Sequence, residues 1–216
     1  MAAPVRPFLF VLAGVNGAGK SSVGGALLRD HGLDWFNPDG FARALRSELG
    51  LGLEEANAQA WAHGKSLLEA AIANGTSFAF ETTLGGSTIS ELLRDASRTH
   101  SVVMWYCGLA SPELHIARVA QRVSQGGHPI PEDKIRERWA ASRLNVIELL
   151  PFLERLQVFD NSVSVDVGQD IPDPHLVLEV EGGRVVLPRK FDARSLGATP
   201  EWARPIVEAA IQLFRA

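Results

Sequence analysis

The sequence predicts an α/β fold, a P-loop kinase-like sandwich with a five-stranded, mainly parallel sheet flanked by helices, plus a C-terminal hairpin and helix. Two observations predict it. The short apolar run Phe8–Ala13 ends in a glycine-rich segment, which is typical of a buried central strand. Short apolar segments then alternate with longer amphipathic ones as far as residue 160, which indicates a parallel sheet with helices on both faces.

The elements follow in chain order. We expect strands at residues 8–13, 34–36, 77–81, 101–109 and 156–159. We expect helices at residues 20–29, 41–49, 56–74, 87–98, 112–124 and 132–150. Ser87 and Ser111 are the expected N-caps of two of these helices, and Pro112 suits the first helical position after Ser111.

The alternation of strand and helix patterns ends after Asn161. Residues 175–180 and 184–187, joined across Glu181-Gly182-Gly183, predict a β-hairpin, and residues 200–215 predict an amphipathic helix. We therefore expect a P-loop kinase core at residues 1–162, with a lid around 122–138, and an extension of the same domain at residues 163–216.

Composition limits the class of protein. The net charge of -4 and the sequence pI of about 5.9 do not favour binding to nucleic acid, which usually requires a basic face. The single cysteine, Cys107, allows no internal disulfide, which suits a reducing compartment. No segment has the ~20 consecutive apolar residues of a membrane span. We expect a cytoplasmic protein that binds neither nucleic acid nor membrane.

Residues 14–21 read GVNGAGKS and match the phosphate-binding loop pattern GxxxxGK[ST]. Backbone N–H groups of such a loop bind phosphate oxygens, the lysine reaches the β and γ phosphates, and the serine hydroxyl is a ligand for Mg²⁺. The sequence therefore predicts ATP as phosphoryl donor and Mg²⁺ as cofactor. The ATP-binding residues predicted here are Gly14, Asn16, Gly17, Ala18, Gly19, Lys20, Ser21 and Ser22.

Two carboxylates follow predicted strands, where ligands of parallel sheets bind. Asp39 follows residues 34–36 and is either the general base for an acceptor hydroxyl or only a helix N-cap. Glu81 ends residues 77–81 and is either a ligand for acceptor or metal or a cap of the next segment. Thr82 and Thr83 add hydroxyls, and Asp39 or Glu81 is the expected second ligand of Mg²⁺ beside Ser21.

No aspartate follows the apolar segment at residues 101–109, where many P-loop proteins carry their metal-binding acid. This absence counts against a motor-type or AAA-type ATPase.

Arginines flank a hinge that reads QGGHP at residues 125–129. Arg118 and Arg122 share one helical face before it, and Arg136 and Arg138 follow it. Arginines that close over a moving phosphoryl group stabilise its charge, so this pattern predicts a lid, with Arg122 as the catalytic arginine. The alternative is a solvated face on which neighbouring acids pair with the arginines. His128 either contacts substrate or fills a turn.

Together these motifs resemble the zeta-toxin family of P-loop kinases, especially its compact members. The resemblance rests on the loop at 14–22, Asn-Pro-Asp at 37–39, Phe-Glu-Thr-Thr at 80–83 and Gly-Gly-His at 126–128. It implies phosphorylation of a sugar hydroxyl on UDP-N-acetylglucosamine, with an antitoxin protein as partner. Asp39 would be the base, Arg118 and Arg122 would contact ATP, and Asn161 would lie near the adenine. The implied acceptor-binding residues are Asp39, Glu81, Thr82, Thr83, His128 and Arg138.

Two other functions remain open from the residues alone. One is a kinase of another small hydroxyl compound, such as an antibiotic or a nucleoside. The other is a nucleotide-binding switch that transfers no phosphate, for which we find no residue suited to orient water.

Overall fold

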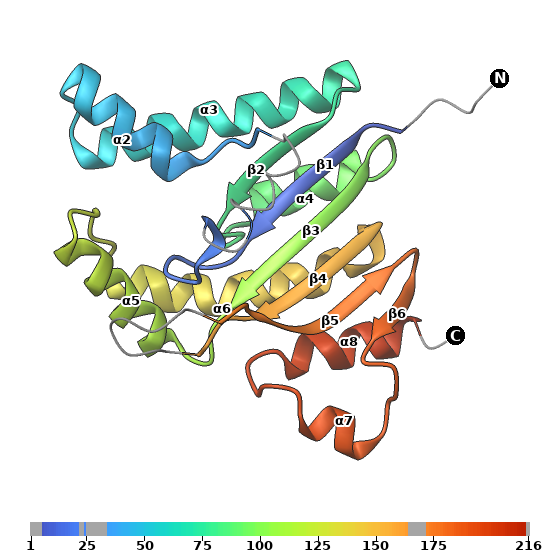
Figure 1. The fold of residues 1–216 in the computed structure, drawn as a ribbon. Coiled ribbons are helices and arrows are strands. Elements are labelled where there is room, and N and C mark those ends of the chain that lie inside the picture. Colours follow the sequence, from blue (N-terminus) through green and yellow to red (C-terminus); the bar gives the residue numbers. More distant parts are fainter. Residues whose placement is uncertain (1–5, 22–23, 25–33, 164–171, 215–216) are drawn as a thin grey trace.

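The computed structural model describes residues 6–21, 24, 34–163 and 172–214. Its sheet has six strands in the order β2-β1-β3-β4-β5-β6 (Figure 1). Strands β1 to β4 are parallel to one another, β5 is antiparallel to β4, and β6 is antiparallel to β5. The strands are β1 Phe8–Ala13, β2 Phe78–Thr82, β3 Ser101–Gly108, β4 Arg155–Asp160, β5 His175–Glu181 and β6 Arg184–Leu187.

The predicted fold class is confirmed, with two differences in the strands. Residues 34–36 form no strand, and only Phe36 bridges to Phe80, at the edge of the sheet. The predicted hairpin joins the main sheet, because β5 pairs with β4 along its whole length. The sheet therefore has six strands, not the five expected.

The helices cover the sheet much as the sequence predicts. They are α2 Pro38–Leu49, α3 Leu53–Asn74, α4 Ser87–Ala96, α5 Pro112–Ser124, α6 Glu132–Leu149, α7 Ala193–Gly197 and α8 Arg204–Phe214, with a 3-10 turn at Leu150–Phe152. Helices α4, α6 and α8 contribute most of the side chains that bury one face of the sheet. The helix predicted at 20–29 lies mostly outside the described residues.

Helix caps correct two expectations. Asn37 caps α2, since its side-chain oxygen accepts a hydrogen bond from Gly40 N at 3.0 Å. The N-cap interpretation of Asp39 is therefore wrong, and its carboxylate lies in the first turn of α2. Gly86 rather than Ser87 is the N-cap of α4. Ser111 caps α5 as expected, accepting from Leu114 N at 3.3 Å.

The central strand β1 lies between β2 and β3, and all three run in the same direction. Leu12 pairs with Glu81 and Ala13 with Thr82, so the end of β1 lies beside the end of β2. Ligands of open parallel sheets bind at this edge. None of the described helices is long and apolar enough to cross a membrane.

Candidate active site

The phosphate loop follows β1 and is closely packed. The backbone φ angles of Gly14 and Gly17 are 141° and 84°, which side chains disfavour. A Cβ at Gly14 would lie 2.2 Å from the carbonyl oxygen of Cys107, and one at Gly17 would lie 2.8 Å from that of His115. The backbone N–H of Gly14 also donates to Thr82 O at 3.2 Å. The glycines thus let the loop lie against β2, β3 and α5.

Glu81 is buried, with 7% of its surface exposed, and is held by three donors. Its Oε1 accepts hydrogen bonds from Ser21 Oγ at 2.9 Å, Trp35 Nε1 at 3.1 Å and Asn37 Nδ2 at 3.2 Å. These bonds compensate the cost of burying the carboxylate. Ser21 and Glu81 therefore lie in contact, and both offer the oxygen ligands that Mg²⁺ prefers.

Asp39 lies within reach of two lid side chains. Arg122 Nη1 is 3.4 Å from Asp39 Oδ2, and His128 Nε2 is 4.0 Å from Asp39 Oδ1. Burial lowers the pKa of His128 below its ordinary value, and the carboxylate of Asp39 only partly offsets this effect. The imidazole is therefore mainly neutral at pH 7.

Arg122 has unused hydrogen-bonding capacity. Its Nε and Nη2 atoms are buried and have no hydrogen-bond partner among the described residues. Buried guanidinium N–H groups without a partner are costly, and an incoming anion would satisfy them.

Asn16 of the phosphate loop is contacted from both α5 and α6. Its Oδ1 accepts from Arg138 Nη1 of α6 at 2.8 Å, and its backbone oxygen lies 2.8 Å from His115 Nδ1 of α5. A carbonyl oxygen only accepts, so Nδ1 carries the proton. Burial lowers the pKa of His115 to about 4, so this imidazole is neutral at pH 7.

Asn161, expected near the adenine, and Arg118, expected to contact ATP, both donate to backbone oxygens. Asn161 Nδ2 donates to Ala18 O at 2.9 Å, and Arg118 Nη2 donates to Val163 O at 3.0 Å. The structure thus brings Asn161 to the phosphate loop, while Arg118 contacts the chain after β4. Ser22, predicted to bind ATP, lies outside the described residues.

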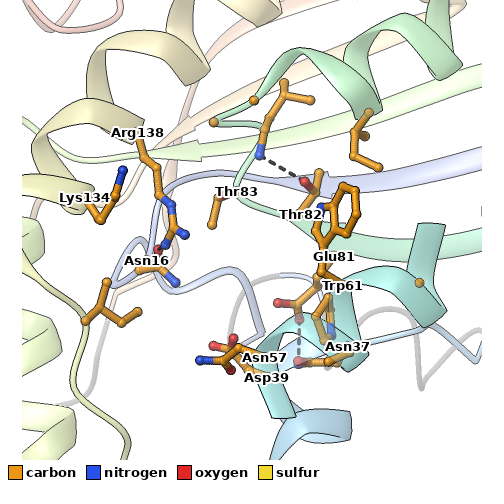
Figure 2. Close-up of a pocket in the computed structure, with 18 of the residues that line it drawn as sticks. Asn16, Asn37, Asp39, Asn57, Trp61, Glu81, Thr82, Thr83, Lys134 and Arg138 are labelled. Carbon is orange, nitrogen blue, oxygen red and sulfur yellow. Dashed lines mark hydrogen bonds between the residues drawn. The ribbon is translucent and has the colours of Figure 1, made fainter. Parts of the chain in front are cut away.

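A cavity of about 690 Å³ opens beside the phosphate loop (Figure 2). Every residue predicted to bind the acceptor lines it, namely Asp39, Glu81, Thr82, Thr83, His128 and Arg138. Figure 2 shows Lys134 and Arg138 on one side of the cavity and Trp61 on the other. Asn16 and Lys20 connect the cavity to the phosphate loop.

The predicted lid separates the two arginine-bearing helices. Helix α5 ends at Ser124, α6 begins at Glu132, and Gly126 adopts a φ angle of 91° between them. Arg136 is 2.5 Å from Glu113 in an exposed ion pair, so the solvated-face interpretation is correct for this arginine. Arg122 and Arg138 instead face the site.

The sequence profile of a family described as an AAA domain matches residues 9–145, which include the phosphate loop, Glu81 and the lid. The chain belongs to this AAA-domain family. The absence of an aspartate after β3 therefore does not separate the chain from AAA-domain proteins, contrary to the expectation from sequence. A protein of unassigned function from Haemophilus influenzae strain Rd is 29% identical over 133 residues, which are 58% of this chain and 88% of that protein.

Solved structures share the fold of this AAA-domain chain. The AvrRxo1-ORF1:ORF2 complex with ATP has a TM-score of 0.63 at 18% identity, covering 97% of this chain and 77% of that one. The PezAT toxin–antitoxin system of Streptococcus pneumoniae has a TM-score of 0.59 at 15% identity, covering 99% and 89%. A putative kinase from Chloroflexus aurantiacus has a TM-score of 0.51 at 19% identity, covering 63% and 78%. The predicted zeta-toxin-like P-loop kinase fold is confirmed.

Several site residues of this AAA-domain chain were missed from the sequence. Asn37 and Trp35 flank the bridge at Phe36, and both donate to Glu81. Asn37 also caps α2. In the sequence, an asparagine before a proline indicates only a turn, so nothing pointed to its contact with Glu81. Asn57 and Trp61 of α3 line the cavity from an element that carries no recognisable motif.

Proposed function

We propose that the protein is an ATP-dependent kinase that transfers the γ-phosphoryl group to a hydroxyl of a small molecule. The observation that supports this most is the cavity beside the phosphate loop. It has room for a second substrate, and Asp39 lines it while touching the lid arginine Arg122. A switch protein needs no such cavity, whereas a kinase must hold donor and acceptor together.

On the donor side, the loop N–H groups and Lys20 bind the phosphates of ATP. Ser21 and Glu81 are in contact at 2.9 Å and are the residues proposed to hold Mg²⁺. The bound ion would neutralise charge on the β and γ phosphates. The two unpartnered nitrogens of Arg122 are proposed to bind the γ-phosphate as the lid closes.

On the acceptor side, Asp39 is proposed to accept the proton of the attacking hydroxyl. Arg122 contacts this carboxylate at 3.4 Å, from the helix that precedes the Gly-Gly-His segment. Glu81, Thr82 and Thr83 would position the acceptor from the end of β2, and His128 from the lid.

A UDP-amino-sugar is the acceptor that we propose first, because the motifs resemble those of zeta-toxin kinases. The cavity volume of about 690 Å³ lies within the range of ligand pockets, roughly 300–1,000 Å³. Lys134 and Arg138 supply positive charge for a diphosphate group. An antibiotic or nucleoside acceptor is the alternative.

A protein partner is also proposed. Two of the similar structures are described as assemblies, AvrRxo1-ORF1 with ORF2 and the PezAT toxin–antitoxin system. By analogy an antitoxin would bind this chain. The single cysteine of this chain is buried and free, so we propose that the protein acts in the cytoplasm.

A mass-spectrometric screen tests the function. The protein is incubated with ATP, Mg²⁺ and a metabolite pool that includes UDP-sugars, and an acceptor is expected to gain one phosphoryl group. Slow ATP hydrolysis with no gain on any acceptor would favour the switch. Calorimetry with an ATP analogue tests the donor side, since Lys20→Ala should weaken binding while the exposed control Lys190→Ala should not.

A further inference from the structure

Helix α3 forms one wall of the cavity, and it does so with a single stripe of side chains. Asn57, Trp61 and Lys65 are spaced four residues apart, so they lie one above another on the same helical face. Ala60 and Gly64 also line the cavity, and the ring of Phe36 packs so closely on Gly64 that a Cβ there would lie 2.5 Å from it. The wall is therefore apolar at Trp61 and polar on either side.

Trp61 lacks the hydrogen bonds or ring contacts of the other tryptophans, of which Trp105 makes edge contacts with Phe10 and Phe159. The indole N–H groups of Trp35, Trp139 and Trp202 donate to Glu81 Oε1, Leu109 O and Asp160 Oδ1. Among the described residues, Trp61 makes no hydrogen bond and no ring contact, and 52% of its surface is exposed. A large indole that lines a cavity without a partner offers a surface on which a ring can stack.

We propose that Trp61 is the stacking platform for the acceptor, which therefore carries a ring whose face lies on the indole and whose polar edge meets Asn57. This inference rests on the proposed kinase function. The distance along α3 supports the placement of the amide, since Asn57 is one turn from Trp61 on the cavity face. A short acyclic polyol would leave the indole uncovered and much of the cavity filled with water.

Two kinds of ring share this chemistry. A pyranose presents an apolar face of C–H groups and a polar edge of hydroxyls, and a nucleobase presents a π face and a polar edge. Both stack on indole, and stacking on an aromatic side chain is worth about 1–3 kcal/mol per ring for nucleobases. The two sources are separated below by testing each ring on its own.

The test uses steady-state kinetics with four acceptors, UDP-N-acetylglucosamine, N-acetylglucosamine, uridine and the acyclic gluconate. We expect a ring acceptor to be preferred over gluconate. Trp61→Ala should raise the KM for that acceptor roughly tenfold, in line with the loss of one stacking contact. Trp61→Phe should restore most of the affinity, and the KM for ATP should not change in either variant.

Two further variants keep the result interpretable. Leu144→Ala removes another exposed apolar side chain, 60% exposed on α6 and outside the cavity, and should leave all constants unchanged. Asn57→Ala removes the proposed edge contact and should also raise the acceptor KM, which tests the subsite if Trp61→Ala fails to fold. Preference for N-acetylglucosamine over uridine assigns the ring to a sugar, and the reverse assigns it to a base.

An unchanged acceptor KM in Trp61→Ala, with transfer to a ring acceptor intact, would overturn this inference and leave the kinase function standing. A preference for gluconate would also overturn it. If none of the four acceptors is phosphorylated, the inference fails, and the metabolite screen decides separately whether the kinase function fails with it.

Discussion

Nη1 of Arg122 lies 3.4 Å from Oδ2 of Asp39. This contact joins helix α5 to the first turn of α2, and Asp39 also lines the cavity. Asp39 is proposed to be the base and Arg122 the phosphate ligand, so the two proposed functional groups are adjacent. The other two guanidinium nitrogens of Arg122, Nε and Nη2, have no hydrogen-bond partner among the described residues and are available to an anion.

Replacing Asp39 tests the base. Asp39→Asn keeps the size and shape of the side chain but removes the carboxylate that accepts the proton, so we expect transfer to fall by about 10²–10⁴-fold. ATP affinity should stay unchanged by calorimetry. Asp95→Asn, which removes an exposed carboxylate 3.7 Å from Arg98, is the control. Normal turnover in Asp39→Asn would exclude the base assignment.

Replacing Arg122 tests the lid. Arg122→Ala should lower kcat on the order of 10³-fold, because an arginine that stabilises the transferring phosphoryl group contributes that much in related chemistry. Arg136→Ala removes a lid arginine that is engaged with Glu113 on the surface, and it should behave as wild type. Equal effects of the two substitutions on kcat would contradict a specific role for Arg122.

Replacing Glu81 tests the proposed metal site. Glu81→Gln keeps an oxygen for Ser21, Trp35 and Asn37 but removes the negative charge, so more Mg²⁺ should be needed for half-maximal activity. Activity is measured against Mg²⁺ concentration, with the exposed Glu69→Gln as control. A Mg²⁺ dependence identical to wild type would place the metal elsewhere.

His115 gives a pH dependence of stability. Its pKa is lowered from 6.5 to about 4 by burial, so the unfolded chain binds a proton below pH 6.5 that the folded chain does not. Stability due to this group is present above pH 6.5 and is lost as the pH falls toward 4, by up to about 3 kcal/mol.

Urea unfolding at pH 7, 5.5 and 4.5 measures this loss. His115→Gln cannot titrate, yet its amide retains a donor for Asn16 O, so the variant should lose less stability than wild type as the pH falls. Carboxylates contribute the same acid loss to both proteins, so the difference between them isolates His115. Parallel curves would show that the imidazole is not the cause.

Much of the fold and part of the site could be predicted from the sequence, because they depend on local patterns. The loop at residues 14–21 is a contiguous motif, and Ser111 with Pro112 gives an unambiguous helix start. The hairpin was also predicted locally. Its pairing with β4 was not, since a contact between Asp160 and His175 depends on how distant segments pack.

The rest of the site depends on contacts between segments that are far apart in the sequence. Asn37 was hidden because one side chain performs two roles, as N-cap through Oδ1 and as donor to Glu81 through Nδ2. His115 looks like an ordinary residue of an amphipathic helix, and its bond to Asn16 spans 99 positions in the chain. Trp61 was unremarked because a helical periodicity does not say which exposed face borders a cavity.

The destination of the γ-phosphoryl group tests the central claim most directly. The protein is mixed with Mg²⁺, the acceptor found in the screen and ATP that carries ¹⁸O in its γ-phosphoryl group. The products are then separated and analysed by mass spectrometry. We predict that the label appears as an intact phosphoryl group on the acceptor hydroxyl, and that Asp39→Asn slows its appearance by about 10²–10⁴-fold. Label found only in inorganic phosphate, at a rate independent of acceptor, would contradict the assignment as a kinase.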